Sequence, residues 1–153
     1  MSNKGITLVG GGITLPLKLF SGSTFPREQI TPAIGVNFSA YGTPNTDGTS
    51  YEPKHIWNFV AIVSPADAEL LDVLETIGRT ENILIYDYTR RVWDTAARSR
   101  ALAPGASEVA SGSRTGYYAQ FYGRVTQPIK PEEQGAYIFS AVQLTETDRV
   151  LPA

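Results

Sequence analysis

The sequence predicts a mainly β fold with one α-helix, built as an antiparallel β-barrel or sandwich that the helix flanks. Three observations favour this fold. The 153-residue chain is lightly charged, at 18%, and rich in turn-forming residues, with 14 Gly and 10 Pro. Its apolar runs are short, alternating, and full of β-branched and aromatic residues. One stretch, about residues 65–77, has the period of an amphipathic helix instead. The length predicts a single domain over residues 1–153.

The N-terminal region reads as two apolar runs, residues 5–9 and 13–20, around a triple glycine at 10–12. This pattern predicts a hairpin or a flexible arm, and residues 1–12 are the candidate arm. Pro16 in the second run cannot donate a backbone hydrogen bond. We therefore expect that run to lie at a sheet edge.

Later strands are expected wherever alternating apolar residues return, at residues 33–41, 55–63, 82–88, 117–126 and 136–146. Residues 55–63 are apolar on both faces, which predicts a central strand that is covered on both sides. Residues 42–50 consist of turn-forming residue types and predict a loop. Residues 94–116 lack apolar periodicity and predict a long loop, a length that is uncommon without a functional role.

The helix has a clear start and a clear apolar stripe. Ser64 is a good N-cap, Pro65 suits the first helical position, and Asp67 adds a capping acid. Gly78 is the expected stop. The apolar stripe comprises Ala66, Leu70, Val73, Leu74 and Ile77. The core is expected to contain Trp57, Phe59, Leu70, Leu74, Ile77 and Ile85.

Composition excludes several kinds of chemistry. The chain has no Cys and one His, which excludes disulfides, thiolate metal sites and any site with two imidazoles. The formal charge of −2 argues against nucleic-acid binding as the main function. No metal, cofactor or catalytic residue is predicted, and His55 is expected to be a surface or loop residue. No stretch suits a signal peptide or a membrane span, so we expect a soluble protein made in the cytoplasm.

Two features suggest contacts with other proteins. Aromatic residues occupy both faces of residues 117–126 and 136–146, which fits either cross-strand packing or a subunit interface or carbohydrate platform. The arginines of the 94–116 loop fit either a solvated surface or an arm that docks on a neighbouring subunit. The candidate interface residues are Ile6, Leu8, Arg98, Arg100, Arg114, Tyr118 and Tyr122.

The middle and end of the chain carry a family resemblance. The runs that carry it are Val60-Ala61-Ile62-Val63, Ser64-Pro65-Ala66-Asp67, Ile83-Leu84-Ile85-Tyr86-Asp87 and the closing strands at 122–126 and 137–146, with the helix ending at Gly78. Over residues 55–146 the chain resembles small minor tail proteins of long-tailed bacteriophages and the N-terminal domain of phage distal tail proteins.

This resemblance implies a split β-barrel with one helix, the fold shared with tail-tube subunits. It also implies a structural virion subunit of a tail tip or baseplate. Such a subunit forms a homo-oligomeric ring, a trimer or hexamer, around the DNA channel. Its partners are the adjacent tail-tube, hub or baseplate proteins, and DNA only in passage. It has no catalytic residues. The alternative from the residues alone is a carbohydrate-binding β-sandwich that uses surface aromatics.

Overall fold

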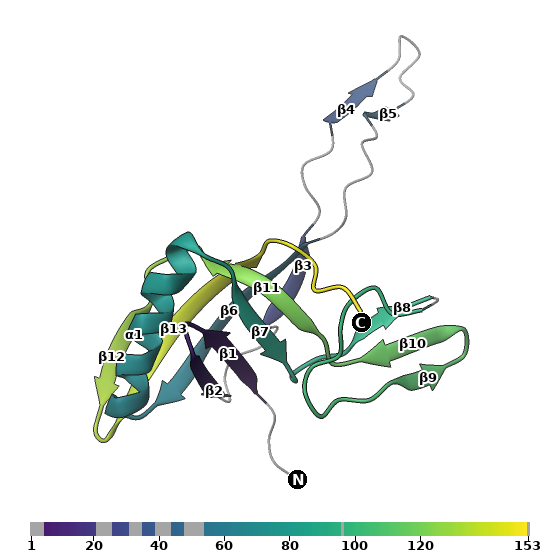
Figure 1. The fold of residues 1–153 in the computed structure, drawn as a ribbon. Helices are drawn as coiled ribbons and strands as arrows, with labels where there is room; N and C mark the ends of the chain where they lie inside the picture. The colour runs from purple at the N-terminus through teal and green to yellow at the C-terminus, as the bar shows by residue number, and fades with distance from the viewer. Residues whose placement is uncertain are drawn as a thin grey trace.

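The computed structural model describes residues 5–20, 26–30, 35–38, 44–47, 54–95 and 97–152. Their elements form an antiparallel β structure with one helix (Figure 1). In chain order these are β1 (Ile6–Gly10), β2 (Ile13–Leu19), β3 (Arg27–Ile30), β4 (Gly35–Phe38), β5 (Pro44–Asp47), β6 (Lys54–Val63), α1 (Pro65–Thr80), β7 (Ile83–Asp87), β8 (Val92–Asp94), β9 (Val109–Ser111), β10 (Arg114–Tyr117), β11 (Gln120–Val125), β12 (Lys130–Gln134) and β13 (Tyr137–Glu146).

Six strands close into a barrel. The pairing runs from β1 through β7, β11, β13, β6 and β2 back to β1, and every pair is antiparallel. The barrel is split, because one edge of β13 pairs with β12 along its first half and with β11 along its second half. In the same way, one edge of β6 is shared by β3 and β2. The predicted fold class, an antiparallel barrel-like structure flanked by a helix, is confirmed.

The N-terminal segment is part of the barrel wall. Gly11 and Gly12 have φ values of 55° and 79°, which suit the two-residue turn that joins β1 to β2. Ile6 and Leu8 are 0% and 1% exposed. The prediction of a flexible arm is therefore wrong for the described residues 5–12, and Ile6 and Leu8 are core residues instead of interface residues. Alternating strand geometry points both side chains inward.

Pro16 lies where β2 has only one neighbour. It stands opposite Thr7 of β1, and β2 pairs with β6 only at Lys18 and Leu19. The position of Pro16 is thus an open edge, although β2 as a whole lies between two strands. The missing N–H removes no ladder hydrogen bond there.

Helix α1 begins as the sequence predicts and ends later. The Ser64 hydroxyl accepts the Asp67 backbone N–H at 3.2 Å, and Pro65 opens the helix. Gly78 does not stop the helix, which continues to Thr80. Gly78 is buried against β11, where an added Cβ would lie 2.7 Å from a methyl of Val125. A glycine is needed at position 78 because the helix lies too close to β11 for a larger side chain, and not because the backbone makes a left-handed turn there.

The core fills the barrel between α1 and the far end. Trp57, Phe59, Leu74 and Ile85 are at most 2% exposed, and Ile77 packs partly buried against them. Leu70 is 38% exposed, so its predicted place in the core is wrong. The second face of β6 is only partly covered, because Asn58 is exposed and its even-numbered neighbours are half-buried. The prediction of cover on both faces of that strand is also wrong.

Residues predicted as loops contain additional strands. The 94–116 region holds β9 and β10, which form a three-stranded sheet with β8. Within the predicted 42–50 loop, β5 pairs with β4, and residues 127–135, between two of the expected strands, contain β12. These strands are three to five residues long and contain no run of alternating apolar residues, which is the pattern that marks a strand in sequence. In the described part of the chain, no helix is long and apolar enough to cross a membrane.

Candidate functional site

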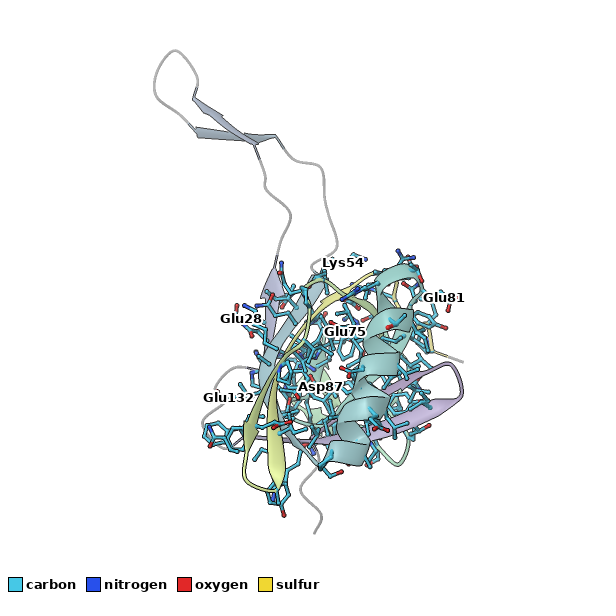
Figure 2. The ribbon with its side chains drawn as sticks, turned by 90° about the vertical axis from the view of Figure 1, so that its left-hand side faces the viewer. Glu28, Lys54, Glu75, Glu81, Asp87 and Glu132 are labelled. Atoms are coloured by element: carbon cyan, nitrogen blue, oxygen red, sulfur yellow. The ribbon has the colours of Figure 1, made fainter. Side chains whose placement is uncertain are left out.

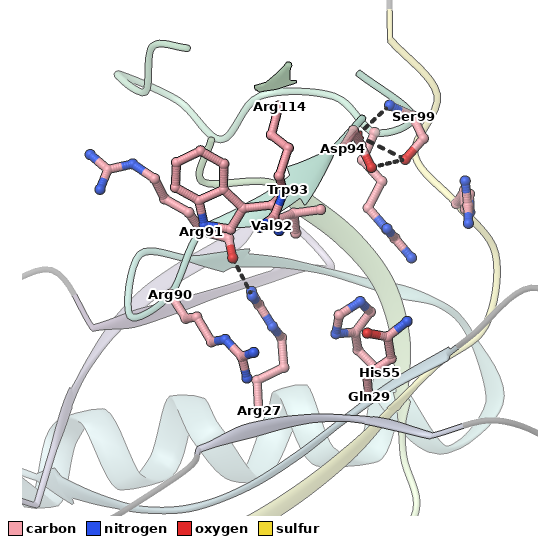
Figure 3. Close-up of a pocket in the computed structure, with 12 residues that line it drawn as sticks. Arg27, Gln29, His55, Arg90, Arg91, Val92, Trp93, Asp94, Ser99 and Arg114 are labelled. Carbon is pink, nitrogen blue, oxygen red and sulfur yellow. Dashed lines mark hydrogen bonds between the residues drawn. The ribbon is translucent and has the colours of Figure 1, made fainter. Parts of the chain in front are cut away.

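A cationic pocket of about 380 Å³ lies at the barrel end away from α1 (Figure 3). Helix α1 packs near Gly10 and Ile83, the ends of β1 and β7 that lie farthest from Ile6 and Asp87. The pocket lies beside Asp87, between the barrel and the β8–β10–β9 sheet. Six of its lining residues are arginines: Arg27, Arg90, Arg91, Arg100, Arg114 and Arg149. Among the described residues, Asp94 is the one carboxylate in the lining.

One buried ion pair forms the floor of this site. Arg27 of β3 donates from Nη1 to Asp87 Oδ2 of β7 at 2.9 Å, and the side chains are 2% and 0% exposed. The indole N–H of Trp57 donates to the same oxygen at 3.1 Å. Arg27 also donates from Nη2 to the Arg91 carbonyl at 3.1 Å. Burial lowers the pKa of the Arg27 guanidinium from its usual value, and the Asp87 carboxylate opposes that shift.

A second buried ion pair lies beside the first. Arg100 donates from Nε and Nη2 to the two carboxylate oxygens of Glu146, each at 3.2 Å. The backbone N–H of His55 donates to Glu146 Oε1 at 3.1 Å. This two-point geometry fixes the guanidinium plane and satisfies both charges within the protein. The Arg100 side chain is therefore committed to its own chain, which corrects its prediction as an interface residue.

The Phe121 ring separates these charges from the apolar core. It is fully buried, and the Arg27 and Arg100 guanidinium carbons lie 5.2 and 5.3 Å from its centroid. The rings of His55 and Trp57 lie 5.2 and 4.9 Å from the same centroid. Both cations thus contact an aromatic ring within the cation–π range.

His55 is buried and uncharged in this setting. It is 8% exposed and lies on β6, not on a surface or loop as the sequence analysis expects. Burial lowers its pKa from 6.5 to about 3, and neighbouring arginines add to that shift. Its Nδ1 atom is buried and has no hydrogen-bond partner among the described residues.

A hydrogen-bond network shapes the wall around Arg100. Tyr117 donates its hydroxyl to Asp94 at 2.6 Å, and the Ser99 backbone N–H donates to Asp94 at 2.9 Å. The Arg100 backbone N–H donates to the Tyr117 hydroxyl at 3.1 Å. Partial burial acts to raise the pKa of Asp94, but the bonds from Tyr117 and Ser99 and the charge of Arg100 hold it below its usual value.

The outer arginines are held less firmly. The Arg91 guanidinium lies 4.6 Å from the Tyr118 ring centroid, and the Arg114 guanidinium lies 5.3 Å from that of Trp93. The exposed Arg90 forms no ion pair with any described residue. The described part of the chain contains no group of three or more acidic, His or Cys side chains that could hold a metal ion. The arrangement is suited to binding an anion.

Of the candidate interface residues, Arg100 and Arg114 line this pocket. Arg98 instead pairs with Glu108 away from the lining. Tyr118 and Tyr122 are half-buried, and Tyr118 packs under Arg91.

The sequence analysis missed the charged residues that continue an apolar strand face. Asp87 follows Ile83 and Ile85 at the alternating spacing, and Glu146 follows Val142 and Leu144. A charge on the buried face at a strand end is the signal that could have found them.

Fold and site thus define a helix-flanked antiparallel barrel with a buried charge network at one end. Comparison with known proteins adds no relative: no protein-family model, no curated protein and no solved structure matches the chain.

Proposed function

We propose that the chain is a structural subunit of a phage tail tip or baseplate that forms a homo-oligomeric ring around the DNA channel. Two things support this beyond the resemblance over residues 55–146. The barrel flanked by one helix agrees with the fold that the resemblance implies. The described residues also provide two separate surfaces, which a ring of identical subunits needs because each subunit contacts two neighbours differently.

The β4–β5 hairpin is the observation that carries the proposal. These two strands pair with each other and with no other described element. Figure 1 shows them standing apart from the barrel. An isolated two-stranded hairpin is marginally stable in water. A neighbouring subunit would supply the contacts that the other described residues do not.

The second surface is an apolar groove along β12 and β13. Phe20 and Phe139 lie in it with ring centroids 5.3 Å apart, and the groove measures about 690 Å³. Tyr137 at the start of β13 is 57% exposed. Exposed aromatic groups of this kind are enriched at subunit interfaces. The neighbouring subunit's β4–β5 hairpin is the occupant that we propose for this groove.

The register of β3 and β6 offers a clean test. Ile30 stands directly opposite Lys54, so an Asn-Gly turn can replace residues 31–53 without disturbing the barrel. Light scattering coupled to size-exclusion chromatography should show a closed oligomer, such as a trimer or hexamer, for the full chain at high micromolar concentration. The shortened variant should be a monomer with an unchanged unfolding temperature.

Two controls sharpen that comparison. Phe20→Ser should weaken assembly from the other surface, whereas Leu151→Ser, at another exposed apolar residue, should not. An unchanged oligomer after removal of the hairpin would contradict the proposal. So would a full chain that stays monomeric and forms no rings in electron micrographs.

The aromatic residues do not favour the carbohydrate alternative. Tyr117 and Phe121 are buried, and the Arg114 guanidinium lies over the Trp93 ring beside the pocket. We therefore propose neither sugar binding nor a catalytic role for this chain.

A further inference from the structure

We propose that the cationic pocket at the barrel end binds the phosphoryl group of a small phosphorylated molecule. This inference does not depend on the ring proposal. The described lining of the pocket includes no residue of β4 or β5, and it shares no residue with the groove that contains Phe20. Its volume of about 380 Å³ falls within the ~300–1,000 Å³ range typical of small-molecule sites.

The pocket contains buried nitrogen atoms that no described residue satisfies. Arg27 Nε and His55 Nδ1 are both buried and lack a hydrogen-bond partner among the described residues. Figure 3 shows Arg27 between Arg90 and His55, with all three side chains in the pocket lining. A buried polar atom without a partner is costly unless a bound group satisfies it. An oxyanion in the pocket would do so.

The positive charge of the arginines in the pocket also favours binding of an anion. The arginines that act on His55 are Arg27, Arg90, Arg100 and Arg149. Asp87 and Glu146 are each held by one buried arginine, Arg27 and Arg100. The exposed Arg90 forms no ion pair with any described residue. A phosphate group with a charge near −2 would supply a counter-ion for it.

The directions of the donors favour phosphate over carboxylate. The unsatisfied nitrogens and the Arg90 guanidinium come from β3, from β6 and from the segment between β7 and β8. They approach the pocket from different sides. A phosphoryl group presents three oxygens in a tetrahedral arrangement, whereas a carboxylate presents two in one plane. Guanidinium groups bind phosphate oxygens in paired hydrogen bonds.

Calorimetry with inorganic pyrophosphate as the probe, at about 0.15 M salt to screen weak surface attraction, tests the site. The full chain should bind pyrophosphate. Arg90→Gln should weaken binding by about 10-fold or more, because it removes a charged hydrogen-bond donor. Arg90 has no ion pair among the described residues, so the variant should fold normally. Arg79→Gln makes the same charge change on exposed α1 and should bind as the full chain does.

A second readout locates the ligand. His55 is the one histidine of the chain, so its imidazole nuclear magnetic resonance signals need no assignment by mutation. Pyrophosphate should shift these signals and raise the pKa of His55, and chloride at equal ionic strength should not.

Absence of binding, equal affinity in Arg90→Gln, or an unmoved His55 signal would overturn the proposal. Equal affinity for a hexaglutamate peptide would also overturn it, by assigning the pocket to carboxylates.

Discussion

Arg27 and Asp87 are joined by a fully buried ion pair across the end of the barrel, with Nη1 and Oδ2 2.9 Å apart. They are 60 positions apart in the chain and lie on β3 and β7, strands that are not neighbours in the sheet. Because Trp57 of β6 donates to the same carboxylate oxygen, one side chain links three strands. Figure 2 shows Asp87 surrounded by the barrel strands, whereas Glu28, the next residue after Arg27, lies at the outside.

We expect Asp87→Asn to lower the free energy of unfolding by about 3–5 kcal/mol, because it leaves the Arg27 charge buried without its counter-ion. Urea denaturation followed by Trp fluorescence measures this. Arg79→Gln breaks the exposed pair with Glu75 and should cost no more than about 1 kcal/mol. Similar losses in the two variants would show that burial does not determine the strength of the Arg27 pair.

Stability should fall as the pH is lowered from about 6.5 to about 3, in part because of His55. The folded protein holds the pKa of His55 near 3, while the unfolded chain has the usual 6.5. Between these values the unfolded state binds the extra proton, so acid favours unfolding. The full shift corresponds to roughly 4–5 kcal/mol, and above pH 6.5 His55 has no effect.

Chemical denaturation of the wild-type chain and of His55→Gln across that range isolates this effect. The charged groups that face His55 are Arg27, Arg90, Arg100, Arg149 and Glu146, and all are present in both proteins. The wild type should lose more stability than the variant on acidification. Parallel stability curves, or a His55 pKa near 6.5 by nuclear magnetic resonance, would refute the burial of a neutral imidazole.

Gly78→Ala should destabilise the protein by about 1–3 kcal/mol, although alanine is the better helix former. The new methyl would meet Val125 Cγ2 at 2.7 Å, and valine has little freedom to rotate away. Thermal unfolding measures the effect. The same change in a Val125→Ala background should cost much less or stabilise the helix. If Gly78→Ala alone stabilises the protein, then α1 and β11 are not in close contact there.

Apolar periodicity predicted the barrel strands and the helix because it reports burial directly. The alternation at 55–63 and the capped stripe from Ser64 both correspond to elements of the structure. Periodicity could not show β9 or β12, whose residues are all exposed. It also could not show which strands close the barrel, since this depends on pairings between distant residues such as Phe59 and Val142.

The candidate site was largely hidden from sequence reasoning. Its arginines are spread from Arg27 to Arg149 and have no motif spacing. The sequence marked Arg100 only as a candidate interface residue, whereas the structure buries it with Glu146, 46 positions later. Chain folding alone brings these residues together. Only Asp87 and Glu146 can be recognised from the local sequence, because each places a charge at the end of the apolar face of its strand.

Strand β13 completes the barrel, since it is the one element that pairs with both β6 and β11. It lies at residues 137–146, after every other strand of the barrel. During synthesis, the edges of β6 and β11 therefore remain without their final partner until β13 has been made. Such late, long-range pairing makes folding slow and exposes strand edges to aggregation meanwhile. The order of synthesis thus determines when the barrel becomes competent to close.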